Sequence, residues 1–219
     1  MERTITVKGL GKVSASPDLI TISFDLEITE PKYEQTMETS GRLLAALRAS
    51  ISQTGLDGKD LKTTGFSVDT KYESYRDKNN NYQQRFIGYT CAHRLSLEFA
   101  LDMKTLASVL SAIAECEAHP EFKIRFTVKD PTAVSEQLLA KAIKDAAKKA
   151  ETLAKAANVK LGAVQRIDCN WEEIHLYSET DMDMKCCAPM LAESSAPGID
   201  IEPDDIDVSD SVIVVWTIE

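Results

Sequence analysis

Apolar and polar residues alternate along residues 20–28, the clearest strand pattern in the chain. The apolar positions are Ile20, Ile22, Phe24, Leu26 and Ile28. One apolar and one polar face are typical of an antiparallel strand with one buried and one wet side. Similar alternation predicts strands over residues 4–15, 66–72, 89–99, 122–128 and 164–171. The polar run over residues 76–81 predicts the tip of a long hairpin arm.

The first and last predicted strands have special features. Gly9 and Gly11 interrupt the first strand, and glycine inside a strand usually marks a bulge, so we expect a bend or bulge there. Residues 212–218 form a continuous apolar run, which predicts a strand buried on both faces. We expect this strand in the centre of a sheet, paired with the first or second strand. The two ends of the chain would then lie together.

Apolar residues spaced by three and four predict a long helix from Pro131 to about Ala157. Its stripe consists of Val134, Leu138, Ala142, Ala146, Ala150, Leu153 and Ala157. Asp130 and Pro131 supply the cap and the first-position proline. Small alanines let a helix lie close to its neighbour, and strands flank this one, so we expect it to pack on a sheet. Shorter helices are predicted after Pro31 and Asp102.

The predicted elements follow the order ββαββαβαβ, then a loop over residues 178–204, then a last strand. Hairpins that alternate with helices favour an α+β fold, with helices packed on one side of antiparallel sheets. We expect a single module over residues 1–219. Two lobes are the alternative, residues 1–60 with 205–219 and residues 61–175, joined by the loop 178–204.

The charge and hydropathy of the chain exclude some functions. With 25 Lys and Arg against 35 Asp and Glu, the net charge is −10, which repels phosphate backbones. We therefore expect no nucleic-acid partner. The chain has no apolar run of about 18 residues, so we expect no membrane span. The first residues lack the apolar segment of a signal peptide, which predicts a cytoplasmic protein; a periplasmic protein is the alternative if the sequence is a trimmed mature form.

Soft sulfur ligands gather in one segment, which comprises Met182, Met184, Cys186, Cys187 and Met190. Such ligands suit Cu(I) or Zn(II), but adjacent cysteines lack the two-residue spacer of common zinc sites. Redox sensing by the thiols, or a loop whose methionines pack at a subunit contact, are the alternatives. The odd total of 5 cysteines, with no Cys-x-x-Cys spacing, predicts reduced thiols rather than a disulfide framework.

Other candidate motifs favour structural roles. The Gly9-Leu10-Gly11 segment lacks the third glycine and the following helix of a dinucleotide loop. The histidines at positions 93, 119 and 175 have no partner at ligand spacing. The acids at positions 202, 204, 205, 207 and 210 lack the pattern of a calcium loop, which favours a solvated linker. Lysines 141, 144, 148, 149, 155 and 160 predict a solvated helix face or one that meets an acidic surface on another subunit.

Several segments together resemble the SIMPL-domain family, which is found largely in bacteria. They are residues 6–13 with Pro17-Asp18, then 63–68, 88–90, 140–146 with 149–154, 161–164 and 206–209. The ordered set covers nearly the entire chain. The resemblance implies an α+β fold, self-assembly into larger oligomers including rings, and a link to protection against oxidative stress. Many members resemble exported envelope proteins.

The resemblance supplies no catalytic residues, so we assign none and expect neither enzymatic activity nor a cofactor. The function that we predict is that of a non-catalytic homo-oligomer that acts through its assembled surface. The alternative is a thiol-redox-responsive or soft-metal-binding protein that acts through residues 182–190.

Overall fold

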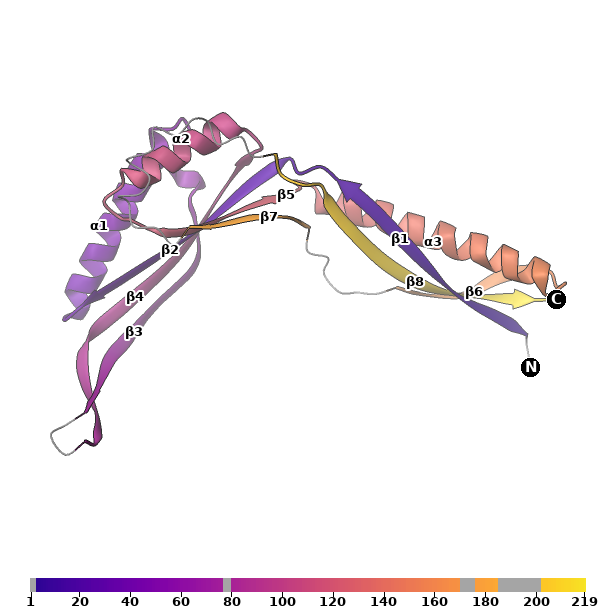
Figure 1. The fold of residues 1–219 in the computed structure, drawn as a ribbon, viewed down its shortest axis with the longest axis horizontal. Coiled ribbons are helices and arrows are strands. Elements are labelled where there is room, and N and C mark those ends of the chain that lie inside the picture. The colour runs from indigo at the N-terminus through magenta and orange to yellow at the C-terminus, as the bar shows by residue number, and fades with distance from the viewer. Residues whose placement is uncertain (1–2, 77–79, 170–175, 185–201) are drawn as a thin grey trace. The chain divides into compact units, whose positions relative to one another are not determined.

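In a computed structural model of the chain, residues 3–76, 80–169, 176–184 and 202–219 are described. The chain forms two compact units (Figure 1). Unit 1 comprises residues 1–18, 126–180 and 203–219, and unit 2 comprises residues 19–125 and 181–202. The sequence pattern groups the residues differently, because it joins residues 19–60 to the amino-terminal strand. The α+β fold with antiparallel strands is confirmed.

Unit 1 contains a three-stranded sheet in the order β1-β8-β6. Its strands are β1 (Thr4–Ala15), β8 (Ile206–Ile218) and β6 (Leu161–Cys169). The first and last strands of the chain pair from Thr4↔Thr217 to Ala15↔Ile206, and both ends of the chain lie at the same end of this unit (Figure 1). The predictions that the last strand is central and joins the chain ends are therefore confirmed.

Strand β8 is buried on one face only, so the prediction of burial on both faces is wrong. Val212, Val214 and Trp216 lie in a core cluster, whereas Ile213 on the opposite face is 41% exposed. A continuous apolar run records hydrophobicity but not how many faces are covered. Among the described residues, only one side of this sheet is covered by a helix, α3 (Pro131–Ala156).

Helix α3 packs on β1 and β8 through a stripe of residues spaced by four. The buried positions are Val134, Leu138, Ala142, Ala146, Ala150 and Ala154. A row of residues four apart runs at about 26° to the helix axis, so the buried stripe shifts sideways as the helix advances. The stripe therefore ends at Ala154. The prediction is wrong at Leu153, which is 50% exposed, and at Ala157, which is exposed.

The glycines of β1 allow close helix packing and do not form a bulge. The pairing of β1 with β8 is unbroken across Gly9 and Gly11, so the prediction of a bulge is wrong. A Cβ on Gly9 would lie 2.6 Å from the Ala146 Cβ, and a Cβ on Gly11 would overlap the Leu138 carbonyl oxygen. Glycine is required here because the helix backbone rests directly on the strand.

Helix α3 also covers the outer edge of β1. The Leu10 backbone N–H donates to Asp145 Oδ2 at 2.7 Å, and Lys149 Nζ donates to the Lys8 carbonyl at 3.3 Å. An edge strand exposes unpaired backbone groups that attract other strands, and these bonds satisfy two of them. Lys149 lies 2.6 Å from Asp145, and its hydrogen bond, followed by that of Leu10, lowers the pKa of Asp145.

The second sheet has five strands in the order β3-β4-β2-β5-β7. They are β2 (Leu19–Glu30), β3 (Lys62–Arg76), β4 (Tyr82–Ala100), β5 (Glu121–Thr127) and β7 (Tyr177–Met184). Helices α1 (Tyr33–Ser52) and α2 (Met103–Ala114) and a short 3-10 turn, η1 (Gly58–Asp60), belong to unit 2, and α1 packs on β2 and β4. The five apolar positions predicted in β2 are all buried.

Strand β7 (Tyr177–Met184) lies almost entirely within residues 178–204, which the sequence pattern predicts as a loop. The next buried residue after Leu176 is polar. It is Ser178, whose hydroxyl donates to the Asp204 carbonyl at 2.7 Å. Asp204 in turn donates its backbone N–H to Thr180 Oγ1 at 3.1 Å. Because hydroxyl groups occupy these positions, no apolar alternation marks the strand.

Two leucines of α3 test the packing of the stripe. Leu138 is fully buried, so Leu138→Ala should lower the free energy of unfolding by about 2–5 kcal/mol. Leu153 is half exposed, so Leu153→Ala should cost less than about 1 kcal/mol. Urea unfolding followed by circular dichroism measures both. Equal losses would show that α3 does not pack as described.

Two glycines test the close approach. Gly11→Ala places a methyl group against the helix backbone and should lower the free energy of unfolding by roughly 1–3 kcal/mol. Gly41 lies in α1, and a Cβ at this position would meet nothing within 4 Å. Gly41→Ala should therefore stabilise the protein by about 0.5–1 kcal/mol. Thermal and urea unfolding compare the two variants, and a stabilised Gly11→Ala protein would refute the contact.

Candidate interaction surface

Strands β3 and β4 continue past the end of β2 as a two-stranded ribbon. The last pair of β2 with β4 is Glu30↔Tyr89, whereas β3 and β4 stay paired to Arg76↔Tyr82. We call residues 71–76 and 82–88 the aromatic arm. Gly88 stands at its base with a φ of 155°, and a Cβ there would overlap the Glu30 carbonyl oxygen. Glycine is therefore required here because β4 passes close against the backbone at the end of β2.

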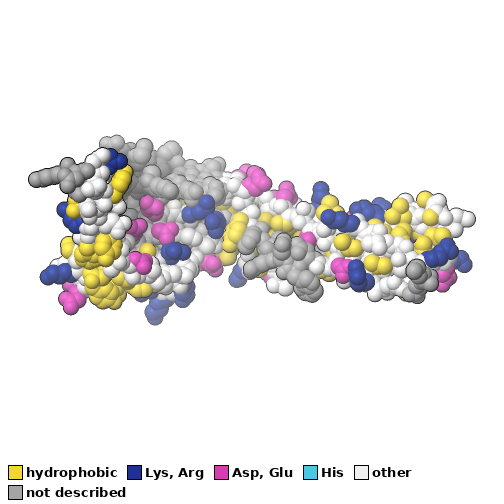
Figure 2. Space-filling view, turned by 90° about the horizontal axis from the view of Figure 1, so that it is seen from below, with side chains coloured by type: hydrophobic (Ala, Val, Ile, Leu, Met, Phe, Trp, Pro, Cys, Tyr) yellow, Lys and Arg dark blue, Asp and Glu magenta, His cyan; other side chains and the backbone are white. Residues whose placement is uncertain are grey.

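Aromatic rings form a continuous row from the arm to the start of α1. The ring centroids are 5.6 Å apart for Tyr72 and Phe86, 5.4 Å for Phe86 and Tyr89, and 5.8 Å for Tyr89 and Tyr33, all edge to face. Tyr72 is nevertheless 54% exposed and Phe86 44%. Figure 2 shows hydrophobic side chains gathered on the part of unit 2 that carries the hairpin of β3 and β4. The rings order one another but leave half of their surface in water.

The charge of the arm is opposite to that of the whole chain. Its described residues include Lys71, Arg76 and Arg85 against one acid, Glu73. Arg85 pairs with Glu73 at 2.7 Å, and the Arg76 guanidinium lies 4.7 Å from the centroid of the Tyr82 ring. Such exposed pairs contribute little to stability. The arm therefore presents a basic and aromatic surface on a chain of net charge −10.

The composition of the arm suits binding. A two-stranded ribbon is marginally stable in water unless something packs against it. Exposed aromatic patches of this kind mark interaction sites on folded proteins. Tyrosine, phenylalanine and arginine are also the residues enriched where proteins associate. The arm is therefore the strongest candidate for an interaction surface in the part of the chain that the structure describes.

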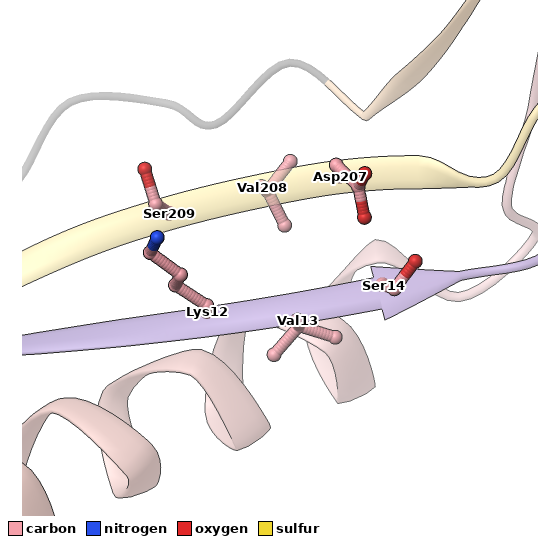
Figure 3. A pocket seen from close by; sticks show the side chains of 6 residues that line it. All are labelled: Lys12, Val13, Ser14, Asp207, Val208 and Ser209. Carbon is pink, nitrogen blue, oxygen red and sulfur yellow. The ribbon is translucent and has the colours of Figure 1, made fainter.

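A hollow of about 460 Å³ lies on the ribbon of β1 and β8, and Figure 3 shows its lining residues. Strand β6 ends at the pair Cys169↔Val212, so within the described ranges residues 206–211 of β8 pair only with β1. Lys12, Ser14, Asp207 and Ser209 line the hollow with polar groups. It offers hydrogen bonds to a small polar molecule, but these residues do not form a nucleophile with an adjacent base.

The predicted sulfur segment falls mostly outside the described residues. Met182 and Met184 belong to strand β7, whereas Cys186, Cys187 and Met190 lie outside the described part of the chain. Metal binding and redox sensing by this segment therefore stay predictions. Over residues 3–76, 80–169, 176–180 and 202–219, no group of three His, Cys, Asp or Glu side chains is arranged to hold a metal ion.

The other candidate residues have local partners or lie apart. The Ser16 hydroxyl donates to Asp205 Oδ1 at 2.7 Å, and the Ser211 backbone N–H donates to Asp210 Oδ1 at 2.6 Å. Of the lysines on α3, Lys149 contacts β1. His119 stands in a turn with a φ of 38°, and residue 175 lies outside the described ranges.

His93 is a buried residue of β4, and one of its ring nitrogens has no hydrogen-bond partner. Its Nε2 lies 2.9 Å from Thr63 Oγ1, whereas Nδ1 has no hydrogen-bond partner. The Phe66 ring packs against the imidazole with centroids 5.2 Å apart. Burial, and then the charge of Arg48, lowers the pKa of His93 from its ordinary value of 6.5. The neutral imidazole is therefore the form that the folded state favours.

The sequence pattern predicts the hairpin arm but not its role. Tyr72, Tyr75, Tyr82 and Phe86 flank the polar tip, and an aromatic residue in an alternating segment is usually assigned to the core. The position of these aromatic residues on both sides of a polar tip is the sequence feature that could have indicated an exposed aromatic surface.

No described helix is both long enough and apolar enough to cross a membrane.

Comparison with known proteins relates the chain to one family. The model of the SIMPL family, described as a protein of unknown function (DUF541), matches residues 5–216. The 26 kDa periplasmic immunogenic protein of Brucella melitensis is 24% identical over 163 residues, which cover 74% of this chain and 65% of the relative. The protein of the same name from Brucella abortus matches equally well. The match thus spans just under two thirds of these relatives.

A third relative is the uncharacterized protein YggE of Edwardsiella ictaluri, 21% identical over 98% of this chain and 86% of its own length. The names of the two Brucella proteins contradict the cytoplasmic location predicted from the sequence, and that prediction is wrong. It rested on residues 1–6 alone, and these do not determine the compartment in which the folded chain works.

The buried imidazole of His93 predicts a pH dependence of stability. Because its pKa in the folded state lies below the unfolded value of 6.5, stability is fully present above pH 6.5 and falls as the pH drops below it. His93→Gln keeps a polar side chain that does not titrate. Its free energy of unfolding should fall less than that of the wild type between about pH 7.5 and about pH 5. Parallel losses in both proteins would contradict the assignment.

Proposed function

The chain belongs to the SIMPL family, and from this premise we propose that it is a self-assembling protein that acts through its assembled surface rather than as an enzyme. The observation that carries the proposal is the aromatic arm. Its rings are ordered against one another and half exposed, on a ribbon that no described element covers. Contact with another copy would cover these rings and support the ribbon.

The free energy gained by covering the exposed rings of the arm is of the size that a weak association needs. An aromatic side chain buries about 150–250 Å² when fully covered. At about 25 cal/mol per Å², covering the exposed half of one ring contributes roughly 2–3 kcal/mol. Several rings together approach what a weak interface needs, because association itself costs about 4–15 kcal/mol. The arm therefore requires a complementary surface and not a single pocket.

The charge of the arm favours a contact between unlike surfaces. In each arm Arg85 is paired with Glu73, and Lys71 lies 3.1 Å from Glu27 of β2. Two arms placed face to face would still bring together two surfaces of net positive charge, and like charges oppose such a contact. The rest of the chain is acidic, so an arm is attracted to a different surface of its neighbour. Head-to-tail contacts of this kind repeat from copy to copy and build rings or longer assemblies rather than closed dimers.

The proposal includes a location and a process. The periplasm is supported by the names of the two Brucella relatives. A role in protection against oxidative stress rests on the family resemblance alone. In this view the assembly protects through the surface that it forms, and no residue of the chain is assigned a catalytic step.

Removal of two arm rings tests the proposal. Wild-type protein should sediment at micromolar concentration as species larger than a monomer, and the double variant Tyr72→Ser, Phe86→Ser should lose the largest of these species. Leu153→Ser, which removes an apolar side chain of similar exposure from α3, should leave the distribution unchanged. Sedimentation velocity measures the species, and circular dichroism verifies that each variant is folded.

Two outcomes would contradict the proposal. The first is a wild-type protein that remains strictly monomeric across the micromolar range. The second is a folded arm variant that assembles as the wild type does. Because the expected contact joins a basic arm to an acidic surface, raising the salt concentration should also shift the wild type towards smaller species.

A further inference from the structure

The two edge strands of the unit 1 sheet differ in whether another element covers their outer side. The edge of β1 is covered by α3, through the bonds of Leu10 and Lys8. Strand β6 forms the other edge, and no described strand pairs with its outer side. The strand contains no proline, and nearly all its residues are exposed. Its pairing with β8 is irregular between Leu161 and Arg166, so the regular part of this edge is residues 166–169. A regular exposed edge is a template for another strand.

The charges of β6 are arranged symmetrically about Ile167. Arg166 pairs with Val215 of β8 and Asp168 with Ile213, so both charged side chains lie on the sheet face that is opposite α3. They are exposed and form an ion pair of 2.9 Å within the strand. An antiparallel copy of the strand, centred on the same residue, would place Arg166 opposite Asp168 of the copy and Asp168 opposite Arg166.

Other registers of the same pairing are less favourable. Centring the pair on Arg166 places two arginines opposite each other, and centring it on Asp168 places two aspartates together. Like charges directly opposite destabilise a pair of strands. Of the three registers centred on Arg166, Ile167 or Asp168, the charge pattern therefore favours the one centred on Ile167.

The helix-side face of β6 supports the same register. Ile167 and Val164 lie opposite Val214 and Trp216, on the face that packs on α3, yet they are 45% and 50% exposed. The helix contacts β1 and β8 far more than β6, so it leaves this margin uncovered. Pairing centred on Ile167 would bring this residue against the same residue of the copy, and apolar cross-strand neighbours stabilise a sheet.

We infer that β6 pairs with β6 of a second copy of this chain, antiparallel and about a two-fold axis at Ile167. The two three-stranded sheets then form one sheet of six strands, with the same surface used by both copies. The inference rests on the proposed self-assembly and names one of its contacts. The aromatic arm would link such pairs into larger assemblies.

A charge exchange tests this contact. In the Tyr72→Ser, Phe86→Ser background the β6 contact remains, so the parent should sediment as a dimer. Arg166→Asp gives an edge with two acids, and Asp168→Arg gives an edge with two bases. Each should weaken dimerisation by about tenfold or more, because both ion pairs become repulsions. An equimolar mixture of the two variants should regain the parent's affinity as a heterodimer.

The outcomes separate this inference from the proposed function. A monomeric parent, single variants that dimerise as the parent does, or a mixture that does not recover would each overturn the β6 contact. The proposed self-assembly would stand in these cases if the wild type still assembles through its arm. A wild type that is monomeric would overturn both.

Cross-linking tests the register. Directly opposed residues in antiparallel strands have Cα atoms about 4.5–5.5 Å apart, which is within reach of a disulfide. Ile167→Cys should therefore form a covalent dimer under mild oxidation, above the level of the unsubstituted protein. Ile213→Cys, on the central strand with 41% exposure, is the matched control and should not. Equal cross-linking of both variants would contradict the two-fold axis at Ile167.

Discussion

The approach of the α3 backbone to β1 at Gly9 and Gly11 is the contact on which unit 1 depends. A methyl group at either position would meet the helix, so the helix and the strand are fixed at one distance. At that distance the alanines of the stripe fill the space between them, and Asp145 reaches the Leu10 amide. The first and last strands of the chain are thereby held under one helix.

The same contact determines which surfaces are left for association. Because α3 lies over β1 and β8, it seals the edge of β1 and leaves β6 and one sheet face exposed. In unit 2 the exposed feature is the ribbon of β3 and β4 beyond the last residue of β2. Each unit thus has an exposed surface, the edge of β6 in unit 1 and the rings of the arm in unit 2, and the proposed contacts between copies use these two surfaces.

The sequence predicts those parts of the fold in which burial is periodic. The five apolar positions of β2 and most of the α3 stripe follow the period of their element and were predicted correctly. The sequence could not show that Ala154 is buried and Leu153 is exposed, because this depends on the angle at which the helix crosses the strands. Gly9 and Gly11 were assigned to a bulge because a contact with a helix more than a hundred residues away leaves no local signal.

The candidate surface was predicted only as a hairpin. Whether Tyr72 and Phe86 face a core or water depends on how far β2 extends beside them, which no local pattern records. Strand β7 was predicted as a loop because its buried position is occupied by Ser178, a polar residue whose hydroxyl is hydrogen-bonded. In both places the outcome depends on residues far away in the sequence, which a local pattern does not record.

Residue-resolved amide hydrogen exchange tests the central contact most directly. The Leu10 amide points out of the sheet edge and is protected only if Asp145 of α3 accepts its hydrogen bond. The account predicts that this amide exchanges as slowly as the amides of β1 that bond to β8. Rapid exchange at Leu10 while the β1 and β8 amides stay protected would show that α3 does not close this edge.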